Sequence, residues 1–446
     1  MAMLTDLYEL TMSAAYLESE IEEIATFDLF IREMPKNRDY LIACGLEQVV
    51  NYLQNISFNN EALDYLKQQG IFKEGFLNYL KNFKFTGELH AIPEGTVVFP
   101  QEPLLRVTAP IIQAQFIETY LLNTITFQTL IATKASRVVN AAGGKEVIDF
   151  ALRRVHGADA GIKGSRATYI GGCVGTSNVL AGMLYGIPIY GTIAHSFIMA
   201  HESEIDAFRN YTDAFPDKCL LLIDTYDTIE GARNSLIIAK ELERLGKRMI
   251  GVRLDSGDLL KLSKEVRKLF DKNGYKYLKI FASGDLDEYK IEELLKKGAP
   301  IDSFGVGTAM GVSKDQPFVN GNYKIVEVTN RKGDVIPRIK LSKGKKTLPG
   351  RKQVYRAYEK GMMSMDVIAL ENEEIDGEKL LEPVIRNGKL VRELPKLKEI
   401  RERCKNSLVK LPEKYKKLTN PPVYKVELSS GLKKLMEELT QKYMRG

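Results

Sequence analysis

The sequence predicts an α/β barrel flanked by a mixed α+β domain. Two patterns indicate this fold class. Seven apolar runs of strand length follow one another between residues 146 and 307, and they start 20–32 residues apart, which leaves room for a helix between most of them. Polar, chemistry-bearing residues follow the carboxyl ends of these runs, where α/β barrels place their active sites. Doubly wound sheets share the local pattern, but seven consecutive units favour a closed or nearly closed barrel.

The first 115 residues are expected to form the mixed α+β domain. Residues 4–15 have apolar side chains at helical spacing with Thr5 as a candidate cap, and residues 46–53 predict a second helix. Residues 85–109 contain short β-rich runs broken by Pro-Glu-Gly and Gln-Glu-Pro turns, which predict a small sheet.

Residues 116–325 form the predicted barrel domain, which would carry the active site. The seven expected strands occupy residues 146–152, 167–172, 187–192, 219–224, 249–254, 278–283 and 301–307. Apolar positions at 259, 262, 266 and 269 predict a helix between two of them. Continuous apolar strands that alternate with helices indicate a parallel sheet covered on its outer face.

Residues 326–446 are expected to form a basic loop and a helical segment that packs back on the body. The stretch 338–356 contains eight Lys or Arg residues and no acid. Its segment 344–352 fails the phosphate-loop pattern, so a solvated basic hairpin is expected, with polyphosphate contact as the alternative. Amphipathic stripes at 397–408 and 432–443 predict two helices.

Composition narrows the function classes. The net charge of +6 over 446 residues is too dilute for a nucleic-acid or membrane surface and favours small anionic ligands. Hydrophobic residues at 44% exclude disorder as the main state. Four scattered cysteines, an acidic start and the lack of an apolar run of about 18 residues predict a soluble cytoplasmic protein without a zinc knuckle or other resident metal ligands.

Four strand-end segments carry candidate chemistry. Asp255 and Asp285 lie in short turns where they could hold sugar hydroxyls or a hydrated Mg²⁺, although capping of the next helix is the simpler interpretation. The glycine-rich segment 305–311 could cradle a phosphate or form a tight turn. His195 could accept a phosphoryl group or act as an acid or base, whereas a lone loop histidine often does neither.

Taken in order, several motifs resemble the nicotinate phosphoribosyltransferase family. They are TDLYELTM (5–12), FALRRVHG (150–157), GTSNVLAG (175–182), GTIAHSF (191–197), IDTYDT (223–228), VRLDSGDL (252–259) and FGVGTAMGVS (304–313). The likeness extends through residue 356. It implies the incomplete α/β barrel of the type II phosphoribosyltransferases, assembled as a homodimer with shared active sites. It also implies that nicotinate and phosphoribosyl pyrophosphate give nicotinate mononucleotide and pyrophosphate, coupled to ATP hydrolysis with Mg²⁺ on the leaving group.

The resemblance also implies residue roles. His195 would accept the γ-phosphoryl group of ATP, and Arg253 and Asp255 would hold the ribose and phosphate region. Phe150 and the partner subunit's Tyr8 would sandwich the pyridine ring. The other residues expected to bind substrate are Arg153, Thr176, Ser177, Asp224, Gly284, Asp285, Gly305, Gly307 and Thr308.

Ser177 bears on the choice of pyridine. Relatives that use nicotinamide have an Asp here, which would repel the carboxylate of nicotinate, whereas a Ser hydroxyl can donate to it. A nicotinamide-specific or quinolinate-specific enzyme and a catalytically inactive binding paralogue remain alternatives. An inactive paralogue would show replaced site residues, but His195, Asp255 and Arg153 are all present.

Overall fold

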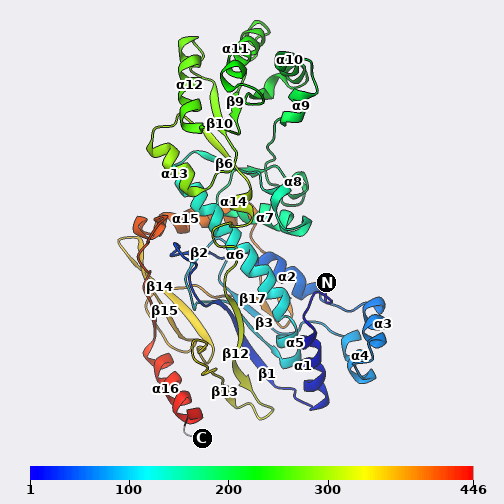
Figure 1. The fold of residues 1–446 in the computed structure, drawn as a ribbon. Helices are drawn as coiled ribbons and strands as arrows, with labels where there is room; N and C mark the ends of the chain where they lie inside the picture. The colour runs from blue at the N-terminus through cyan, green and yellow to red at the C-terminus, as the bar shows by residue number, and fades with distance from the viewer. Residues whose placement is uncertain (445–446) are drawn as a thin grey trace. The chain divides into compact units, whose positions relative to one another are not determined.

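The computed structural model describes residues 1–444 and divides into two compact units (Figure 1). Residues 131–317 form one, here called the barrel unit, and residues 1–130 together with those from 318 onward form the other, here called the sheet unit. These divisions differ from the boundaries expected near residues 115 and 325. The C-terminal part is not a separate unit, because its strands pair with those of the N-terminal part.

The barrel unit is built on six parallel strands in the order β7-β6-β11-β10-β9-β8. Among the described residues no ladder joins β7 to β8, so the barrel is incomplete. This confirms the predicted fold class. The strands are β6 (Glu146–Asp149), β7 (Gly175–Thr176), β8 (Leu220–Leu222), β9 (Gly251–Leu254), β10 (Lys279–Ala282) and β11 (Ser303–Val306).

Two of the seven expected strands are wrong. Residues 167–172 belong to the end of α7 (Ala158–Ile170), whose final turns are buried and stop at the glycine pair 171–172. Residues 187–192 form no strand and contribute one isolated parallel bridge, from Ile189 to Thr176. A short buried apolar run fits either a strand or a helix, and tertiary packing decided between them.

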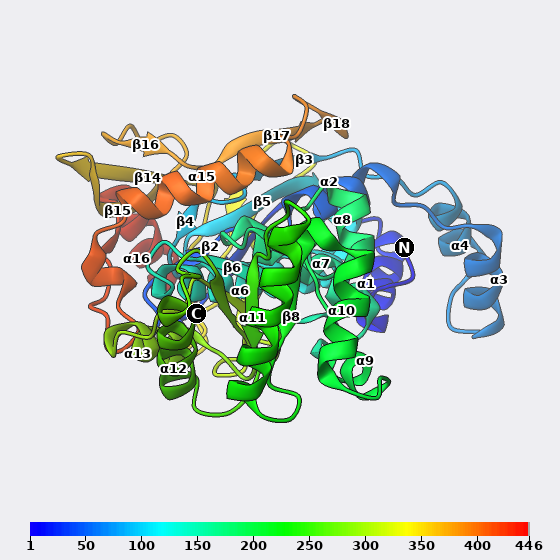
Figure 2. The same cartoon turned by 90° about the horizontal axis from the view of Figure 1, so that it is seen from above.

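Helices follow the strands of the barrel unit and cover its sheet, with α11 against β9 and α12 against β10 (Figures 1 and 2). Val252, Ile280 and Phe304 on adjacent strands are fully buried in this core. The remaining helices are α8 (Val179–Tyr185), α9 (His195–Met199), α10 (Glu204–Ala214), α11 (Thr228–Arg244), α12 (Leu259–Lys272), α13 (Glu288–Lys296) and α14 (Thr308–Gly311), with 3₁₀ turns η1 (Leu152–Arg154) and η2 (Pro216–Lys218). Helix α6 (Glu118–Ala141) contributes residues to both units.

The sheet unit contains a seven-stranded sheet in the order β13-β12-β1-β5-β3-β17-β18 and a four-stranded sheet in the order β16-β14-β15-β19. A separate pair joins β2 to β4. Residues 85–109 contain the strands β3, β4 and β5 but form no small sheet of their own, because β3 and β5 belong to the seven-stranded sheet and β4 pairs with β2. The strands are β1 (Ile24–Ile31), β2 (Leu41–Ile42), β3 (Glu88–Ala91), β4 (Val97–Val98), β5 (Pro103–Pro110), β12 (Gly321–Thr329), β13 (Val335–Pro337), β14 (Lys352–Glu359), β15 (Met362–Leu370), β16 (Glu378–Lys379), β17 (Glu382–Arg386), β18 (Lys389–Leu390) and β19 (Val426–Leu428).

Four helices of the sheet unit, α1, α2, α15 and α16, were expected, whereas α3, α4 and α5 were not. The first begins after Asp6 rather than Thr5, and its buried positions are Glu9, Leu10 and Ser13, while Tyr8 on the expected apolar stripe is exposed. No helix among residues 1–444 has the length and apolar character needed to cross a membrane. The helices are α1 (Leu7–Glu18), α2 (Leu46–Asn55), α3 (Asn60–Gln68), α4 (Glu74–Lys81), α5 (Ile111–Phe116), α15 (Leu397–Lys410) and α16 (Ser430–Met444), with the 3₁₀ turn η3 (Glu413–Lys416).

The basic stretch 338–356 is only partly solvated. Lys352 and Arg356 are buried on β14, where Lys352 pairs with Asp28 at 2.8 Å and Arg356 pairs with Asp366 at 2.6 Å. The expectation of a solvated hairpin at 344–352 is therefore wrong for Lys352, which the buried Asp28 on β1 neutralises. Arg356, beyond that segment, is neutralised by Asp366 on the adjacent strand β15.

Candidate active site at the carboxyl edge of the barrel

Three side chains form a hydrogen-bonded cluster where β9 and β10 end. Nη2 of Arg253 donates to Oδ1 of Asp255 at 2.6 Å, and Nε of Arg253 donates to Oγ of Ser283 at 2.8 Å. The Ser283 hydroxyl donates in turn to Oδ1 of Asp255 at 2.5 Å. Because parallel strands end at the same edge, residues 30 positions apart in the sequence meet here.

The electrostatics of this cluster keep Asp255 ionised. Burial acts to raise the pKa of Asp255, but hydrogen bonds from Ser283 and Arg253, together with the positive charge of Arg253, outweigh it and lower the pKa. Asp255 therefore presents a negative charge beside any cationic centre that forms at this edge.

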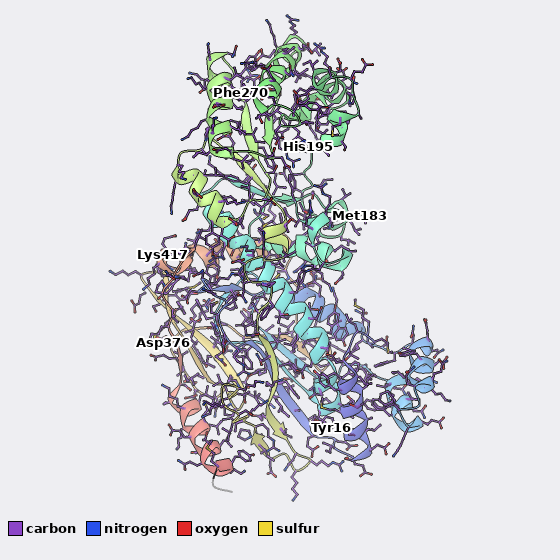
Figure 3. All side chains as sticks on the ribbon, in the orientation of Figure 1. Tyr16, Met183, His195, Phe270, Asp376 and Lys417 are labelled. Carbon is purple, nitrogen blue, oxygen red and sulfur yellow. The ribbon has the colours of Figure 1, made fainter. Side chains whose placement is uncertain are left out.

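His195, labelled in Figure 3, is the first residue of α9. Its imidazole faces the carboxylate of Asp255. Its Nδ1 lies 3.1 Å from Oγ1 of Thr225, and its Nε2 lies 3.8 Å from Oδ2 of Asp255. Its side chain is 39% exposed, so part of the imidazole is accessible to a ligand. Thr225 was not predicted, although it directly follows the predicted Asp224 at a strand end.

Asp224 links the neighbouring loops and has one unused oxygen. Its Oδ2 accepts from the backbone N of Asp255 at 2.9 Å and from Oγ of Ser256 at 2.6 Å. Its Oδ1 is buried and has no hydrogen-bond partner among the described residues. Such an oxygen suits a Mg²⁺ ion that retains most of its ligands as water and substrate oxygens. Residues 1–444 contain no cluster of three His, Cys, Asp or Glu side chains able to hold a metal by themselves.

Phe150 follows β6 and connects this cluster to the glycine-rich turn. The guanidinium of Arg253 lies 5.4 Å from the centroid of the Phe150 ring, and Phe281 lies 5.7 Å from it. A Cβ on Gly305 would come within 2.6 Å of the Phe150 ring, so glycine is required for this packing. Contacts from His195 through Asp255, Arg253 and Phe150 thus reach the turn at 305–311.

A cavity of about 880 Å³ lies inside the barrel unit, lined by Phe150 and Ser177 after β6 and β7 and also by residues at the amino ends of the strands, among them Lys279 and Ser303. Phe150, Phe281 and Ile148 supply apolar and aromatic walls, while Ser177 supplies a hydroxyl. The cavity therefore offers what a flat aromatic acid needs, namely a stacking surface and a hydrogen-bond donor.

Asp149 organises this cavity and was missed by sequence reasoning. It is buried, its Oδ2 accepts from Oγ1 of Thr176 at 3.0 Å, and its backbone O accepts from N of Ser177 at 2.9 Å. Its Oδ1 accepts from the backbone N of Ala151 at 2.9 Å. The carboxylate thereby ties the strand end that presents Phe150 to the one that presents Ser177. Thr176, expected to bind substrate, is buried and bonded to this carboxylate.

Helix capping, the simpler interpretation of Asp255 and Asp285, is done by two neighbouring aspartates instead. Asp258 and Asp287 cap α12 and α13, which leaves Asp255 and Asp285 uninvolved in capping. Gly284 has a φ of +89°, and a Cβ there would lie 1.7 Å from the backbone O of Asp255, so only glycine permits this close approach.

The remaining predicted residues lie in different settings. Gly307 and Thr308 open α14, a single turn, next to the backbone of Phe150. Arg153 is exposed in the 3₁₀ turn after Phe150. Tyr8 belongs to the sheet unit and is 46% exposed.

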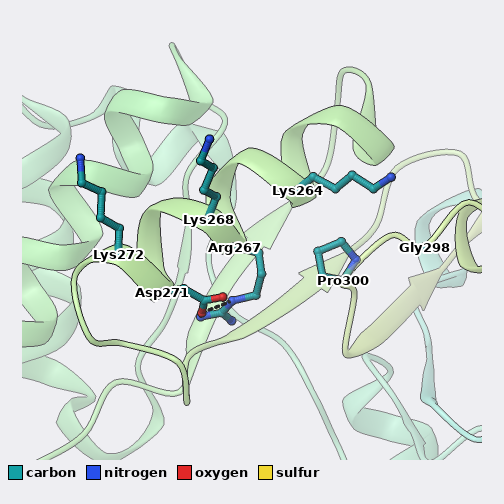
Figure 4. Close-up of a pocket in the computed structure, with 7 residues that line it drawn as sticks. All are labelled: Lys264, Arg267, Lys268, Asp271, Lys272, Gly298 and Pro300. Carbon is teal, nitrogen blue, oxygen red and sulfur yellow. Dashed lines mark hydrogen bonds and ion pairs between the residues drawn. The ribbon is translucent and has the colours of Figure 1, made fainter.

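A second, shallower groove on the barrel unit lacks comparable organisation (Figure 4). It is lined by Lys264, Lys268, Lys272 and Arg267 of α12. Arg267 is occupied by Asp271 and by backbone carbonyls, and Lys264 donates to the backbone O of Lys297. No buried polar group of the described chain is directed into this groove by the contacts of its lining residues, so the catalytic candidate is the strand-end cluster.

Comparison with known proteins identifies the family. The model of the nicotinate phosphoribosyltransferase (NAPRTase) family matches residues 146–347, and the models of its N-terminal and C-terminal domains match residues 3–126 and 375–436. The chain is 44% identical over 420 residues to nicotinate phosphoribosyltransferase pncB2 of Mycobacterium tuberculosis, covering 94% of this chain and 89% of that protein. The chain belongs to the nicotinate phosphoribosyltransferase family.

Other members of the nicotinate phosphoribosyltransferase family agree over nearly the full length. The Bacillus subtilis enzyme is 39% identical, with 95% of this chain and 92% of that protein covered. The crystal structure of human nicotinic acid phosphoribosyltransferase has a TM-score of 0.87 and 29% identity, over 98% of this chain and 99% of that chain. The segment that matches the family model, residues 146–347, contains every strand-end residue described above.

Proposed function

We propose that this chain transfers the phosphoribosyl group of phosphoribosyl pyrophosphate to nicotinate, giving nicotinate mononucleotide and pyrophosphate for NAD synthesis. The observation that carries the proposal is the contact between Phe150, which lines the cavity with Ser177, and Arg253 of the cluster, whose guanidinium lies 5.4 Å from the centroid of the Phe150 ring. Family membership supports the same reaction.

The geometry suits displacement at the anomeric carbon. Loss of pyrophosphate develops positive charge on the ribose, and the ionised Asp255 beside Arg253 can stabilise that charge and hold ribose hydroxyls. The pyridine nitrogen has a free lone pair, so the new C–N bond forms without a general base. The chain's main contribution is therefore to position the ring against the ribose.

ATP coupling, on this proposal, passes through His195. One imidazole nitrogen bonds to the γ-phosphorus of ATP, the bond from that phosphorus to the bridging oxygen breaks, and ADP leaves. Asp255 faces Nε2 and favours the proton on that nitrogen, which leaves Nδ1, beside Thr225, as the nucleophile. Water later hydrolyses the phosphoimidazole and releases phosphate.

Mg²⁺ would neutralise charge on the leaving pyrophosphate when bound. Asp224, with its unpartnered buried Oδ1, and the neighbouring Asp255 are the residues that would hold it, together with substrate oxygens.

Ser177 supports nicotinate over nicotinamide, because a hydroxyl donates to a carboxylate whereas an aspartate there would repel it. Gly284, Asp285, Gly305, Gly307 and Thr308 would surround the ribose 5-phosphate, and Arg153 would pair with the carboxylate or that phosphate.

We also propose a homodimer in the cytoplasm. The partner subunit's Tyr8 would cover the second face of the pyridine ring, which agrees with the exposure of Tyr8 within its own chain. The four cysteines are buried and form no disulfide in the described part of the chain, which fits a reducing compartment.

The test is a substrate panel. Purified protein is given phosphoribosyl pyrophosphate, Mg²⁺ and ATP with nicotinate, nicotinamide or quinolinate, and the mononucleotides are separated and measured. We expect product with nicotinate but not with nicotinamide or quinolinate. When ATP is omitted, the nicotinate product should form far more slowly. His195→Asn should lose ATP hydrolysis but retain slow transfer, whereas His156→Asn, at an exposed histidine, should behave as wild type. Product from another pyridine, or none, would contradict the proposal.

A further inference from the structure

We propose that Lys134 is a positioning residue that fixes the two strand-end turns expected to surround the ribose 5-phosphate, and that it acts through a buried ion network. The inference rests on the proposed function, because that function assigns the phosphate to these turns. One turn follows β10 and contains Gly284 and Asp285, and the other follows β11 and continues through α14. Lys134 lies on α6, within the barrel unit and outside both turns.

A single ammonium group joins the two turns. Nζ of Lys134 lies 2.6 Å from Oε2 of Glu288, the first residue of α13, and donates to Oδ1 of Asp315 at 2.7 Å. Glu288 follows the turn that contains Asp285, and Asp315 follows α14. One side chain on α6 therefore connects the segment after β10 with the segment after β11.

The network is buried and balanced in charge. The side chains of Lys134 and Arg137 are 1% exposed, and that of Glu288 is fully buried. Asp315 is 29% exposed. Nε of Arg137 donates to Oε1 of Glu288 at 3.1 Å, and its Nη2 donates to the hydroxyl of Tyr289 at 3.3 Å. Two cations thus face two carboxylates, and this arrangement is restrictive because separating buried partners leaves a charge unpaired in the core.

Both turns contain backbone that needs support from its surroundings. Asp285 has a φ of +43° and Ser313 has a φ of +45°, and these are the non-glycine residues of the described barrel unit with a positive φ. Residues with a side chain rarely adopt this left-handed conformation, which persists where surrounding contacts enforce it. Asp285 lies three residues before Glu288, and Ser313 lies two residues before Asp315. The two carboxylates that Lys134 binds are therefore placed to hold these strained segments.

Lys134 acts on substrate through the turns and not by contact. Its ammonium group is occupied by two carboxylates, and it does not line the cavity beside Phe150. The backbone N–H groups of a phosphate-binding turn must converge on the anion, so a small shift of either turn weakens binding of phosphoribosyl pyrophosphate. The pyridine cavity depends on Phe150 and Ser177, which follow β6 and β7, so binding of nicotinate should change less.

The test compares Lys134→Met with Lys297→Met in the full-length protein. Methionine is unbranched and apolar, so it fills the site while removing the charge, and Arg137 remains to pair with Glu288. Lys297 forms an exposed ion pair with Glu293 at the other end of α13, so its replacement removes an ion pair from the same helix without touching the network.

Asp315→Ala is the second variant. It frees only the turn after β11 and leaves Lys134 paired with Glu288, so it tests the proposal even where Lys134→Met does not fold. In steady-state kinetics we expect KM for phosphoribosyl pyrophosphate to rise about tenfold in Lys134→Met and about threefold in Asp315→Ala, with KM for nicotinate changed by less than about twofold. Lys297→Met should match wild type.

Calorimetric titration with phosphoribosyl pyrophosphate repeats the comparison without turnover. A dissociation constant about tenfold higher in Lys134→Met supports the proposal whichever base accepts the ribose, which separates this inference from failure of the proposed function. Equal rises in both KM values, a rise that Lys297→Met reproduces, or lower thermal stability with KM and Kd unchanged in the folded variants would overturn it. Wild-type protein that binds no phosphoribosyl pyrophosphate would overturn both proposals.

Discussion

At the scale of single residues, Ser177 and Asp149 show where sequence reasoning succeeds and fails. Ser177, which lines the cavity, was predicted because its residue type can distinguish an acid from an amide, a role that stays a prediction. Asp149 could not, because it ends an apolar strand and its importance depends on Thr168 and Thr176, which approach it only in the folded chain. Thr225 and Ser283 were missed for the same reason.

Ser177→Asp should lower nicotinate use sharply. The added carboxylate would lie in the same cavity as the carboxylate of the substrate, so we expect kcat/KM for nicotinate to fall at least a hundredfold, or about 3 kcal/mol. Steady-state kinetics with nicotinate and nicotinamide measure the effect, and Ser177→Ala serves as the smaller change. Unaltered nicotinate kinetics in the Asp variant would remove Ser177 from the specificity argument.

Asp149→Asn should act on the position of the pyridine rather than on the chemistry. Burial raises the pKa of Asp149 even though Ala151 N and the hydroxyls of Thr176, Ser165 and Thr168 act to lower it. Only the oxygen of the amide accepts hydrogen bonds, whereas both oxygens of the carboxylate do. The contacts that hold the ends of β6 and β7 together should therefore weaken.

We expect a KM for nicotinate raised about tenfold, or about 1.4 kcal/mol, with a smaller change in kcat. Asp213→Asn, at an exposed position, is the matched control. A variant that lost only thermal stability, with KM unchanged, would show that Asp149 has no positioning role.

At the scale of elements, amphipathic helices were predicted well. The stripes at 259–269 and 397–408 match α12 and α15 because a helix on a sheet exposes one face and buries the other. Residues 167–172 were wrongly predicted to form a strand. The final turns of α7 are buried, so the pattern of apolar and polar positions that distinguishes a helix from a strand is absent there. The strand β14 was missed because the charges of the basic stretch suggested a loop, whereas Lys352 and Arg356 pair with the buried carboxylates of Asp28 on β1 and Asp366 on β15.

A buried carboxyl pair makes the sheet unit sensitive to pH. Burial raises the pKa of Glu102 well above its usual range, and the charge of adjacent Asp366 raises it further. The folded chain therefore keeps a proton on Glu102 that the unfolded chain releases above about pH 4.5. Because the folded state binds more protons, this group's stabilising contribution is complete below that pH and is lost progressively as the pH rises toward the folded pKa.

Glu102→Gln should remove this dependence. The amide can still accept from the backbone N of Phe99 and can donate to Asp366 without losing a proton. We expect its free energy of unfolding, relative to wild type, to increase with pH above 4.5 by at most about 1.4 kcal/mol per pH unit, the slope for one proton. Denaturant titrations between pH 5 and 8 measure this, with Glu359→Gln at an exposed position as control. Parallel pH profiles for wild type and Glu102→Gln would contradict the assignment.

At the scale of the whole molecule, the pairing of strands far apart in the chain could not be predicted from the sequence. The local strand–helix alternation predicted the barrel unit, because each parallel strand needs its own crossover. The pairing of β1 with β12 joins residues 24–31 to residues 321–329, and no local signal in either segment specifies that antiparallel register. The sheet unit therefore emerged only from the structure.

Shared active sites predict complementation between two defective variants. Tyr8→Ala should weaken nicotinate binding, and His195→Asn should lose ATP-coupled turnover. If Tyr8 serves the neighbouring subunit, each mixed dimer has one intact site. Co-refolding equal amounts should then restore roughly a quarter of wild-type coupled activity. Mixtures no more active than the average of the separate variants would show that each site is self-contained.

The most direct measurement of the central claim is the position of the phosphoryl group after incubation with ATP. Peptide mapping by mass spectrometry under conditions that preserve phosphohistidine should locate one phosphate on His195, and nicotinate with phosphoribosyl pyrophosphate should accelerate its loss. A phosphate on another residue, or coupled turnover by a chain that carries none at any stage, would contradict the mechanism.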